Sequence, residues 1–510
     1  MKKSVLFVLL TLLAVPFFSE SYRIKDYNFE IEGAGFKFLG ATKDYAILKN
    51  YPLEKGKTFA SEEEFTKFID NYKVKLESSR AFEQIYISYI EDPTGNTDPD
   101  VKDMYLNFVL KDSKHLIVMP YPNYSTTNGL TLALKAKDTN FLGTMNPLNA
   151  DIKLRFRDEA ITPSFSVSFD FPFKLGKFDI VLLNEYGISY TVSDILSGWE
   201  WNTKTGINIA LPYKNLIFNV GFIQFTNGNL NMKVYDDYAY FTENAYFNVP
   251  ITLTEFSNYT TLVYTPGITY NWNWDHNGIN IENDTLTSPE IIFTHSLSNA
   301  SLVWKENFRK GYSLNLTNSF TYNLQRNDII PFVSFEGKVY WNYQANEQPY
   351  WNRFGICADL FAFTYIDLPM NHYKYGYAIG SRLRGVKDTE LYFGNTKPIS
   401  TASSAIMFSI DLPHNVFTTN FSKQILNFNL QFAPFFDMAL VYDRNTQRLF
   451  HPYDGYYCTG LEVLVYPLKW SSITVRASLG FDLKKAVLCN NFIEGISKYK
   501  ELFIGIGLQY

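Results

Sequence analysis

The 510-residue sequence predicts a transmembrane antiparallel β-barrel of about sixteen strands, preceded by a small N-terminal α+β domain. Three observations lead to this fold class. The first residues look like an export signal, long runs from about residue 130 alternate apolar with polar side chains, and the last strand ends on an aromatic residue.

The N-terminus has the features of a cleaved signal peptide over residues 1–21. Two lysines precede a largely apolar run from Val5 to Phe18, and Ser19 and Ser21 are small residues two positions apart. This run is shorter than the roughly 20 residues that a membrane-spanning helix needs. We therefore expect export, with cleavage after Ser21, rather than a retained anchor.

Residues 22–113 predict the small α+β domain. Ser61 and Glu64 have the spacing of a capping box, and apolar residues then recur at helical spacing. The predicted elements are, in order, an extended stretch near 27–32, a helix over about 62–79, and two strands over 84–91 and 101–111. Turn residues separate the two strands, so we expect them to form a hairpin.

Residues 114–510 predict the barrel, because apolar residues recur at every second position over long runs. The clearest runs are Phe165, Val167, Phe169, Phe171 and Phe173; Tyr312, Leu314 and Leu316; and Ile473, Val475, Ala477, Leu479 and Phe481. They exceed ordinary globular strands and match the roughly nine to eleven residues that cross a membrane. At about 24 residues per strand and loop, this region accommodates about sixteen strands.

The closing strand favours a barrel over a soluble sandwich or propeller. No repeat of blade length occurs in the sequence. Apolar and aromatic residues alternate to the end of the chain with small or polar ones, in the order Leu502, Ile504, Gly505, Ile506, Gly507, Leu508, Gln509 and Tyr510. Glycines weaken a strand, so we expect a weak seam where this strand meets the first one, near 130–137. Alternatively, the glycines make room for a loop inside the barrel.

Composition excludes several kinds of function. The net charge is −5 with dispersed basic residues, so we expect no nucleic acid partner. Three distant cysteines and six scattered histidines have no disulfide or metal-ligand spacing, and no nucleophile elbow or phosphate loop is present. We expect neither an enzyme nor a metal or other cofactor, although a site assembled from distant strands would leave no local motif.

Three segments together resemble a known family. Asn140-Phe141-Leu142-Gly143-Thr144 is similar to the turn after the first barrel strand, Gly380–Val386 to an Arg-Gly motif on an in-folded loop, and Phe435–Ala439 to a Phe-x-Asp-x-Gly strand motif. They resemble the BamA/TamA-type (bacterial surface antigen) superfamily of outer-membrane assembly and translocation barrels, in which POTRA domains precede sixteen strands. The residues before the barrel resemble part of one POTRA domain. Ala439 stands where the family has glycine.

The resemblance implies roles for five residues: Leu383, Arg384, Gly385, Phe435 and Asp437. It pairs Arg384 on the loop with Asp437 on a strand. Strand parity independently turns Asp437 toward the lumen, because the even-numbered residues from Leu426 to Phe432 are apolar. Without the resemblance, we would interpret Arg384 as a solvent-exposed charge on a loop.

The implied function is outer-membrane protein insertion or polypeptide translocation, with the N-terminal domain in the periplasm. An edge strand would capture client polypeptides by β-augmentation, and its residues are Gln84, Ile85, Tyr86, Ile87, Ser88, Tyr89 and Ile90. The expected partners are outer-membrane lipid, unfolded outer-membrane or secreted polypeptides, and accessory lipoproteins. The alternatives are that this edge serves only domain packing, and that the barrel is a diffusion channel or a small-molecule or lipid transporter.

Overall fold

The computed structural model describes twenty segments of the chain. They are residues 21–33, 40–79, 81–92, 101–125, 129–157, 160–193, 197–230, 238–256, 260–277, 289–305, 307–343, 353–366, 377–386, 389–392, 395–398, 401–422, 427–443, 448–468, 474–489 and 491–506. The chain divides into two compact units. The first extends to His115 and includes Thr139–Met145, and the second comprises Leu116–Asp138 and Asn146 onward. The predicted signal peptide lies outside the described residues, apart from Ser21.

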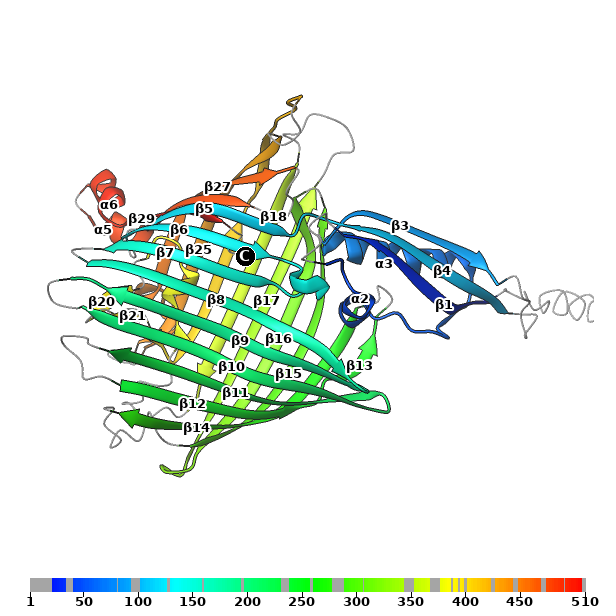
Figure 1. Ribbon diagram of the computed structural model, residues 1–510. Coiled ribbons are helices and arrows are strands. Elements are labelled where there is room, and N and C mark those ends of the chain that lie inside the picture. The colour runs from blue at the N-terminus through cyan, green and yellow to red at the C-terminus, as the bar shows by residue number, and fades with distance from the viewer. Residues whose placement is uncertain are drawn as a thin grey trace, which may run out of the picture. The chain divides into compact units, whose positions relative to one another are not determined.

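The first unit is a four-stranded sheet with two helices (Figure 1). Its elements are β1 (Ser21–Glu32), α2 (Asp44–Asn50), β2 (Thr58–Phe59), α3 (Glu62–Ser78), β3 (Phe82–Glu91), β4 (Val101–Asp112) and the short η1 (Phe141–Gly143). The strand order is β2-β1-β4-β3, with β1 parallel and β3 antiparallel to β4. The last strand therefore lies in the middle of the sheet, and β3 lies at its edge.

The predicted helix and hairpin of the first unit are confirmed. The Ser61 hydroxyl accepts a hydrogen bond from the Glu64 backbone N–H, and the Glu64 carboxylate accepts one from Ala60. The helix buries the apolar residues that carry its periodicity, which are Phe65, Phe68, Ile69, Tyr72 and Leu76. Helix α2 was not predicted, because its seven residues give too few turns for a periodic signal.

A buried polar cluster ties residues 139–145 into the first unit. Asn140 donates to the Thr42 hydroxyl at 2.6 Å, and Thr42 donates from its hydroxyl and its backbone N–H to Asp112 at 2.6 and 2.9 Å. Burial raises the pKa of Asp112 above its usual range. Gly143 has φ +73°, and a Cβ there would lie 2.0 Å from the Ala41 carbonyl oxygen. This turn therefore requires glycine for its close approach.

The second unit is a closed antiparallel barrel. Its strands are β5 (Leu116–Ser125), β6 (Gly129–Asp138), β7 (Leu148–Arg157), β8 (Ala160–Leu175), β9 (Phe178–Thr191), β10 (Gly198–Tyr213), β11 (Leu216–Leu230), β12 (Tyr238–Asn248), β13 (Ile251–Glu255), β14 (Thr261–Asn277), β15 (Glu290–Lys305), β16 (Phe308–Asn323), β17 (Asp328–Tyr343), β18 (Phe354–Tyr365), β23 (Ser404–Asp411), β24 (His414–Thr418), β25 (Phe428–Asp443), β26 (Arg448–Leu449), β27 (Tyr456–Pro467), β28 (Val475–Asp482) and β29 (Lys500–Ile506).

The expected count of about sixteen strands is not confirmed. The described residues form 21 barrel segments. Two pairs of segments share the same neighbours: β12 and β13 both pair with β14, and β23 and β24 both pair with β18 and with β25. Among the described strands, β26 pairs only with β25. Counting each shared pair once and leaving out β26 gives 18 wall strands.

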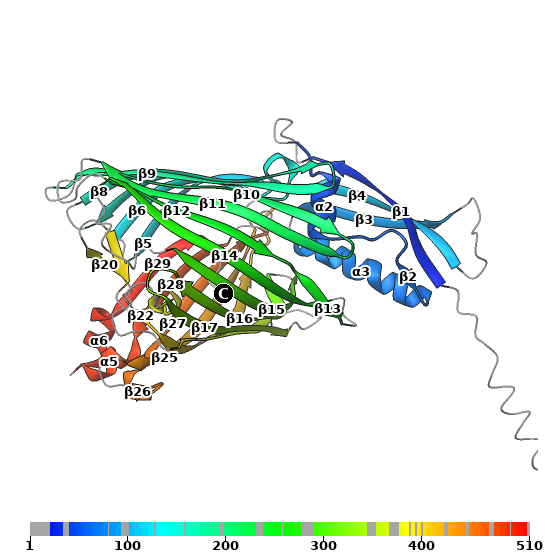
Figure 2. The same cartoon turned by 90° about the horizontal axis from the view of Figure 1, so that it is seen from below.

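The prediction that the first barrel strand is 130–137 is wrong. That segment is β6, and β5 precedes it and pairs with β29, so the closure of the barrel lies between β5 and β29 (Figures 1 and 2). Strand β5 was not predicted because it contains Pro120 and Pro122, and proline argues against a strand that has a neighbour on both sides.

The predicted alternation is confirmed along the wall. On β16, Leu314 and Leu316 are 40% and 44% exposed, and on β28 Leu479 is 46% exposed. The intervening residues of β28, such as Arg476 and Ser478, are buried. The apolar residues therefore face outward and many polar residues face inward. Within the described residues, no helix is both long and apolar enough to span a membrane.

Candidate functional site

The connection between β18 and β23 enters the barrel. Its described parts are β19 (Tyr377–Ala378), η3 (Gly380–Arg382), β20 (Thr389–Tyr392), β21 (Asn395–Pro398) and β22 (Thr401–Ala402). Three of its apolar residues, Ile379, Leu383 and Val386, are 0 to 4% exposed. They pack against inward-facing residues of four wall strands, which include Phe361, Phe363, Ala405, Met407, Ala439, Val441 and Cys458. An apolar patch on the inner wall thus holds the loop, and Ala439 fits within it.

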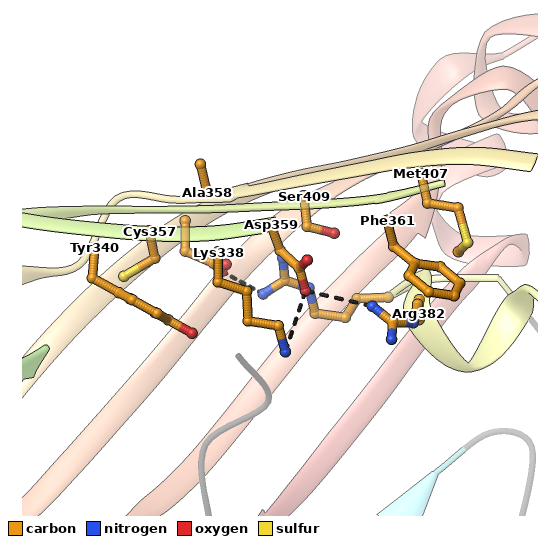
Figure 3. Close-up of a pocket in the computed structure, with 11 residues that line it drawn as sticks. Lys338, Tyr340, Cys357, Ala358, Asp359, Phe361, Arg382, Met407 and Ser409 are labelled. Carbon is orange, nitrogen blue, oxygen red and sulfur yellow. Dashed lines mark hydrogen bonds and ion pairs between the residues drawn. The ribbon is translucent and has the colours of Figure 1, made fainter. Parts of the chain in front are cut away.

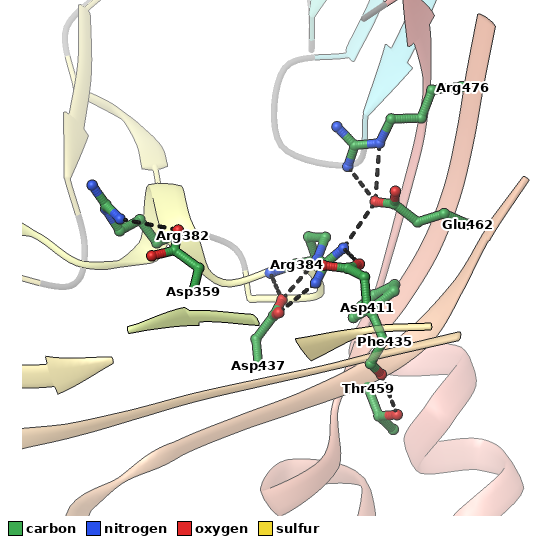
Figure 4. Close-up of polar contacts among 9 residues, drawn as sticks. All are labelled: Asp359, Arg382, Arg384, Asp411, Phe435, Asp437, Thr459, Glu462 and Arg476. Carbon is green, nitrogen blue, oxygen red and sulfur yellow. Dashed lines mark hydrogen bonds and ion pairs between the residues drawn. The ribbon is translucent and has the colours of Figure 1, made fainter. Parts of the chain in front are cut away.

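Arg384 lies at the centre of the docked loop and makes its main contacts with Asp437 on β25 (Figure 4). The guanidinium donates to both carboxylate oxygens, from Nε at 2.9 Å and from Nη2 at 2.6 Å, and the Arg384 backbone N–H donates a third bond at 2.9 Å. Nη1 bonds Asp411 on β23 and Glu462 on β27, the latter at 3.2 Å. One side chain therefore joins the loop to three neighbouring wall strands.

The ionic cluster around Arg384 is almost completely buried. The side chain of Arg384 is 7% exposed, and those of Asp437 and Glu462 are 0% exposed. Arg476 on β28 donates to Glu462 at 3.0 Å, and the Arg384 guanidinium carbon lies 3.8 Å from the centre of the Phe435 ring. Two arginines thus pair with three carboxylates in one network, and Phe435 covers one face of Arg384 by a cation–π contact.

Glycines allow the loop backbone to reach the wall. Gly385 has φ +102°, and a Cβ there would lie 2.4 Å from the Phe481 backbone nitrogen. A Cβ on Gly480 would lie 2.8 Å from the Arg384 carbonyl oxygen. The Gly385 N–H donates to Glu501 on β29 at 3.2 Å, so the loop also contacts the last described strand.

We expect Gly385→Ala to lower the free energy of unfolding by about 3 kcal/mol or more, because it combines an unfavourable φ with a backbone clash. Gly176→Ala is the matched control: its φ is +62°, but nothing lies within 4 Å of the added Cβ, so about 1 kcal/mol is expected. Urea unfolding of both variants in detergent micelles measures the difference. Equal losses would mean that the close approach at Gly385 contributes nothing.

A second ionic cluster holds the loop to β17 and β18 (Figure 3). Arg382 pairs with Glu336 at 3.0 Å and with Asp359 at 3.6 Å, and Lys338 contacts the same two carboxylates at 3.2 and 3.7 Å. The side chains in this cluster are 20 to 28% exposed. Arg382, Lys338 and Asp359 border a cavity of about 240 Å³ between the loop and the wall. Tyr340, Cys357 and Asp411 also line this cavity. The described residues contain no group of side chains suited to a metal ion.

The structure brings the predicted loop and strand residues together. Leu383, Arg384, Gly385, Phe435 and Asp437 all belong to one site. Ile504, Gly505 and Ile506 lie on β29, whereas Gly507, Leu508 and Tyr510 lie outside the described residues. Gln84–Ile90 belong to β3 of the first unit.

Sequence reasoning missed several members of the site, which are Asp411, Glu462, Arg476, Arg382, Glu336 and Asp359. The sequence contained part of the information needed to predict these residues. Glu462 and Arg476 occupy inward positions of alternating strands, where a charged side chain needs a partner or water. Nothing in the sequence indicates which of these charges meet, because strand register and the position of the loop are set only when the wall forms.

The fold of this chain is similar to that of a solved protein structure. CdiB from Acinetobacter baumannii matches with a TM-score of 0.50 and 12% identity over 96% of this chain and 74% of that one. The fold-level resemblance predicted from the sequence is therefore confirmed. Two further structures match. CdiB from Escherichia coli has a TM-score of 0.48 and 9% identity over 95% of this chain and 76% of that one. BamA from Haemophilus ducreyi lacking POTRA domains 1–3 has a TM-score of 0.40 and 15% identity over 95% of this chain and 84% of that one. Neither a family model nor a curated protein matches the sequence.

Proposed function

We propose that this protein resides in an outer membrane and inserts or translocates polypeptide clients there. The observation that carries this proposal is the loop inside the barrel, which Arg384 fastens to Asp437, Asp411 and Glu462 on three wall strands. A passive pore needs an open, polar lumen, and a loop that is held inside the barrel by a buried ionic cluster reduces that opening. The outward apolar side chains of the wall support a lipid environment.

The first unit supports the proposal as a single POTRA-like periplasmic domain. Its elements follow the order strand, helix, short strand, helix and strand hairpin. The sheet places β4 between β1 and β3, which leaves β3 at one edge. Along β3 only Phe82 and Ile85 are buried, and Tyr86 and Ile90 are 65% and 64% exposed. An exposed apolar edge strand is a template for an added strand, so β3 captures an extended client by β-augmentation.

The test of the function is reconstitution into lipid vesicles with a urea-unfolded outer-membrane barrel as client. We expect the protein to accelerate client folding, measured as the fraction of client that resists protease and shifts its gel mobility without boiling. Planar-bilayer conductance on the same preparation tests the channel alternative. Large, stable, solute-selective openings without any acceleration of client folding would replace the proposal with that alternative.

The β3 edge makes a separate prediction in the same assay. Tyr86→Lys combined with Ile90→Lys should reduce client capture at least about tenfold, because charges on an edge strand oppose strand addition. Val109→Lys on the inner strand β4, where the side chain is 40% exposed, is the matched control and should leave capture unchanged. Crosslinking of an extended client peptide measures capture. Equal losses in both variants would assign the effect to charge rather than to the edge.

A further inference from the structure

A helical hairpin joins the last two described barrel strands. It consists of α5 (Leu483–Leu488) and α6 (Phe492–Lys498), which follow β28 and precede β29 (Figures 1 and 2). The two helices meet through small residues. Ala486 and Gly495 are buried, and a Cβ on Gly495 would lie 2.6 Å from the Ala486 carbonyl oxygen. Close packing of this kind leaves no room for bulky side chains between the helices.

The bulky apolar residues of the hairpin point outward instead. Val487 is 62%, Leu488 71%, Phe492 47% and Ile493 77% exposed. A helical hairpin in water normally buries such side chains and exposes the small ones. Four exposed apolar residues on two packed short helices form the kind of surface that another apolar phase covers.

The hairpin lies on the outer side of the wall. The rings of Phe492 and Phe481 are 6.5 Å apart, edge to face. Phe481 has the same parity on β28 as Val475 and Leu479, which are exposed, while Arg476 on the opposite parity is buried. The apolar surface of α6 therefore continues the outward apolar surface of β28.

Polar contacts hold the hairpin in this position. The Asp482 carboxylate caps α5 by accepting from the Lys485 backbone N–H at 3.0 Å. Lys484 reaches the connection before β27 and donates to the Tyr453 and Gly455 carbonyl oxygens. Lys485 and Lys498 are exposed on the same two helices that carry the apolar residues. Lysines next to exposed apolar side chains suit a boundary between acyl chains and phosphate-bearing headgroups.

We propose that the α5–α6 hairpin is an interfacial anchor that inserts Val487, Leu488, Phe492 and Ile493 into lipid beside the closing strand. The occupant of this surface is the membrane lipid at the rim of the barrel, with headgroup phosphates near Lys485 and Lys498. This inference rests on the proposed membrane location. It adds a lipid-binding element outside the strands and fixes the start of β29 at the membrane surface.

The experiment uses an environment-sensitive fluorophore on single cysteines in the full chain, reconstituted in vesicles, with Cys357, Cys458 and Cys489 replaced by alanine. The probe sites are Ile493→Cys on the hairpin, Leu479→Cys on the outward wall and Lys498→Cys on the polar side of α6. Lipids brominated in the upper acyl chain and aqueous iodide serve as quenchers. We expect position 493 to match 479, with strong lipid quenching and protection from iodide, and position 498 to be open to iodide.

Each other outcome is decisive. Iodide quenching at 493 equal to that at 498, with lipid quenching retained at 479, overturns the anchor and leaves the membrane location standing. Protection of 493 from both quenchers also overturns it, because protein rather than lipid would then cover the hairpin. Loss of lipid quenching at 479 overturns the membrane location and the anchor together.

Discussion

Arg384→Ala should undock the loop and reduce client folding to near the rate without protein. The substitution leaves Asp411 and Asp437 buried without their cation, and removing one partner of a buried ion pair costs about 3 to 5 kcal/mol. Asp437→Ala should cost less, because Arg384 keeps Asp411 and Glu462 as partners. Arg384→Lys should be intermediate, since lysine keeps the charge but loses the bidentate fork and the stacking on Phe435.

Urea unfolding in micelles and protease sensitivity of the loop measure these effects beside the folding assay. Arg382→Ala is the matched control, because its partners Glu336 and Asp359 are partly exposed and such pairs contribute at most about 1 kcal/mol. In a double-mutant cycle, Arg384→Ala with Asp437→Ala should be little worse than Arg384→Ala alone. Additive losses, or equal losses at Arg382 and Arg384, would contradict the anchor.

A disulfide that locks the seam between β5 and β29 should stop client insertion. Within the described residues β29 pairs with β5 only at Phe503 and Ser125, whereas β5 pairs with β6 over its whole length. Pro120 and Pro122 lack N–H donors on one edge of β5, and the full pairing with β6 places that edge at the seam. If the seam parts sideways, it offers a strand edge to a client, and a disulfide across it would prevent this.

The antiparallel register places Ile504 opposite Tyr124 across the seam, and both side chains are exposed on the outer face. In a background without the native cysteines, Tyr124→Cys with Ile504→Cys should lose insertion activity on oxidation and regain it on reduction. Ala477→Cys with Ile504→Cys spans β28 and β29, which are paired neighbours away from the seam, and should stay active when oxidised. Full activity of the oxidised seam variant would exclude lateral opening.

The sequence by itself determined the features that local rules govern. Ser61 and Glu64 start α3 because side-chain caps act within one turn. Period-two runs predicted outward Leu479 and Leu316 because strand geometry alternates sides whatever the neighbours are. The same parity turned Asp437 inward, and only the family resemblance suggested Arg384 as its partner.

Tertiary structure alone decided which distant residues meet. Arg384 has three carboxylate partners rather than one, because β23, β25 and β27 become neighbours only when the wall forms. The prolines of β5 fit a strand because the full pairing of β5 with β6 leaves the edge without proline N–H donors at the seam with β29. Ile493 is exposed although it is apolar, because small residues already fill the contact between α5 and α6. In the first two cases the surroundings come from segments far apart in the chain, and in the third they come from the packing of two consecutive helices, which the pattern of either helix alone does not encode.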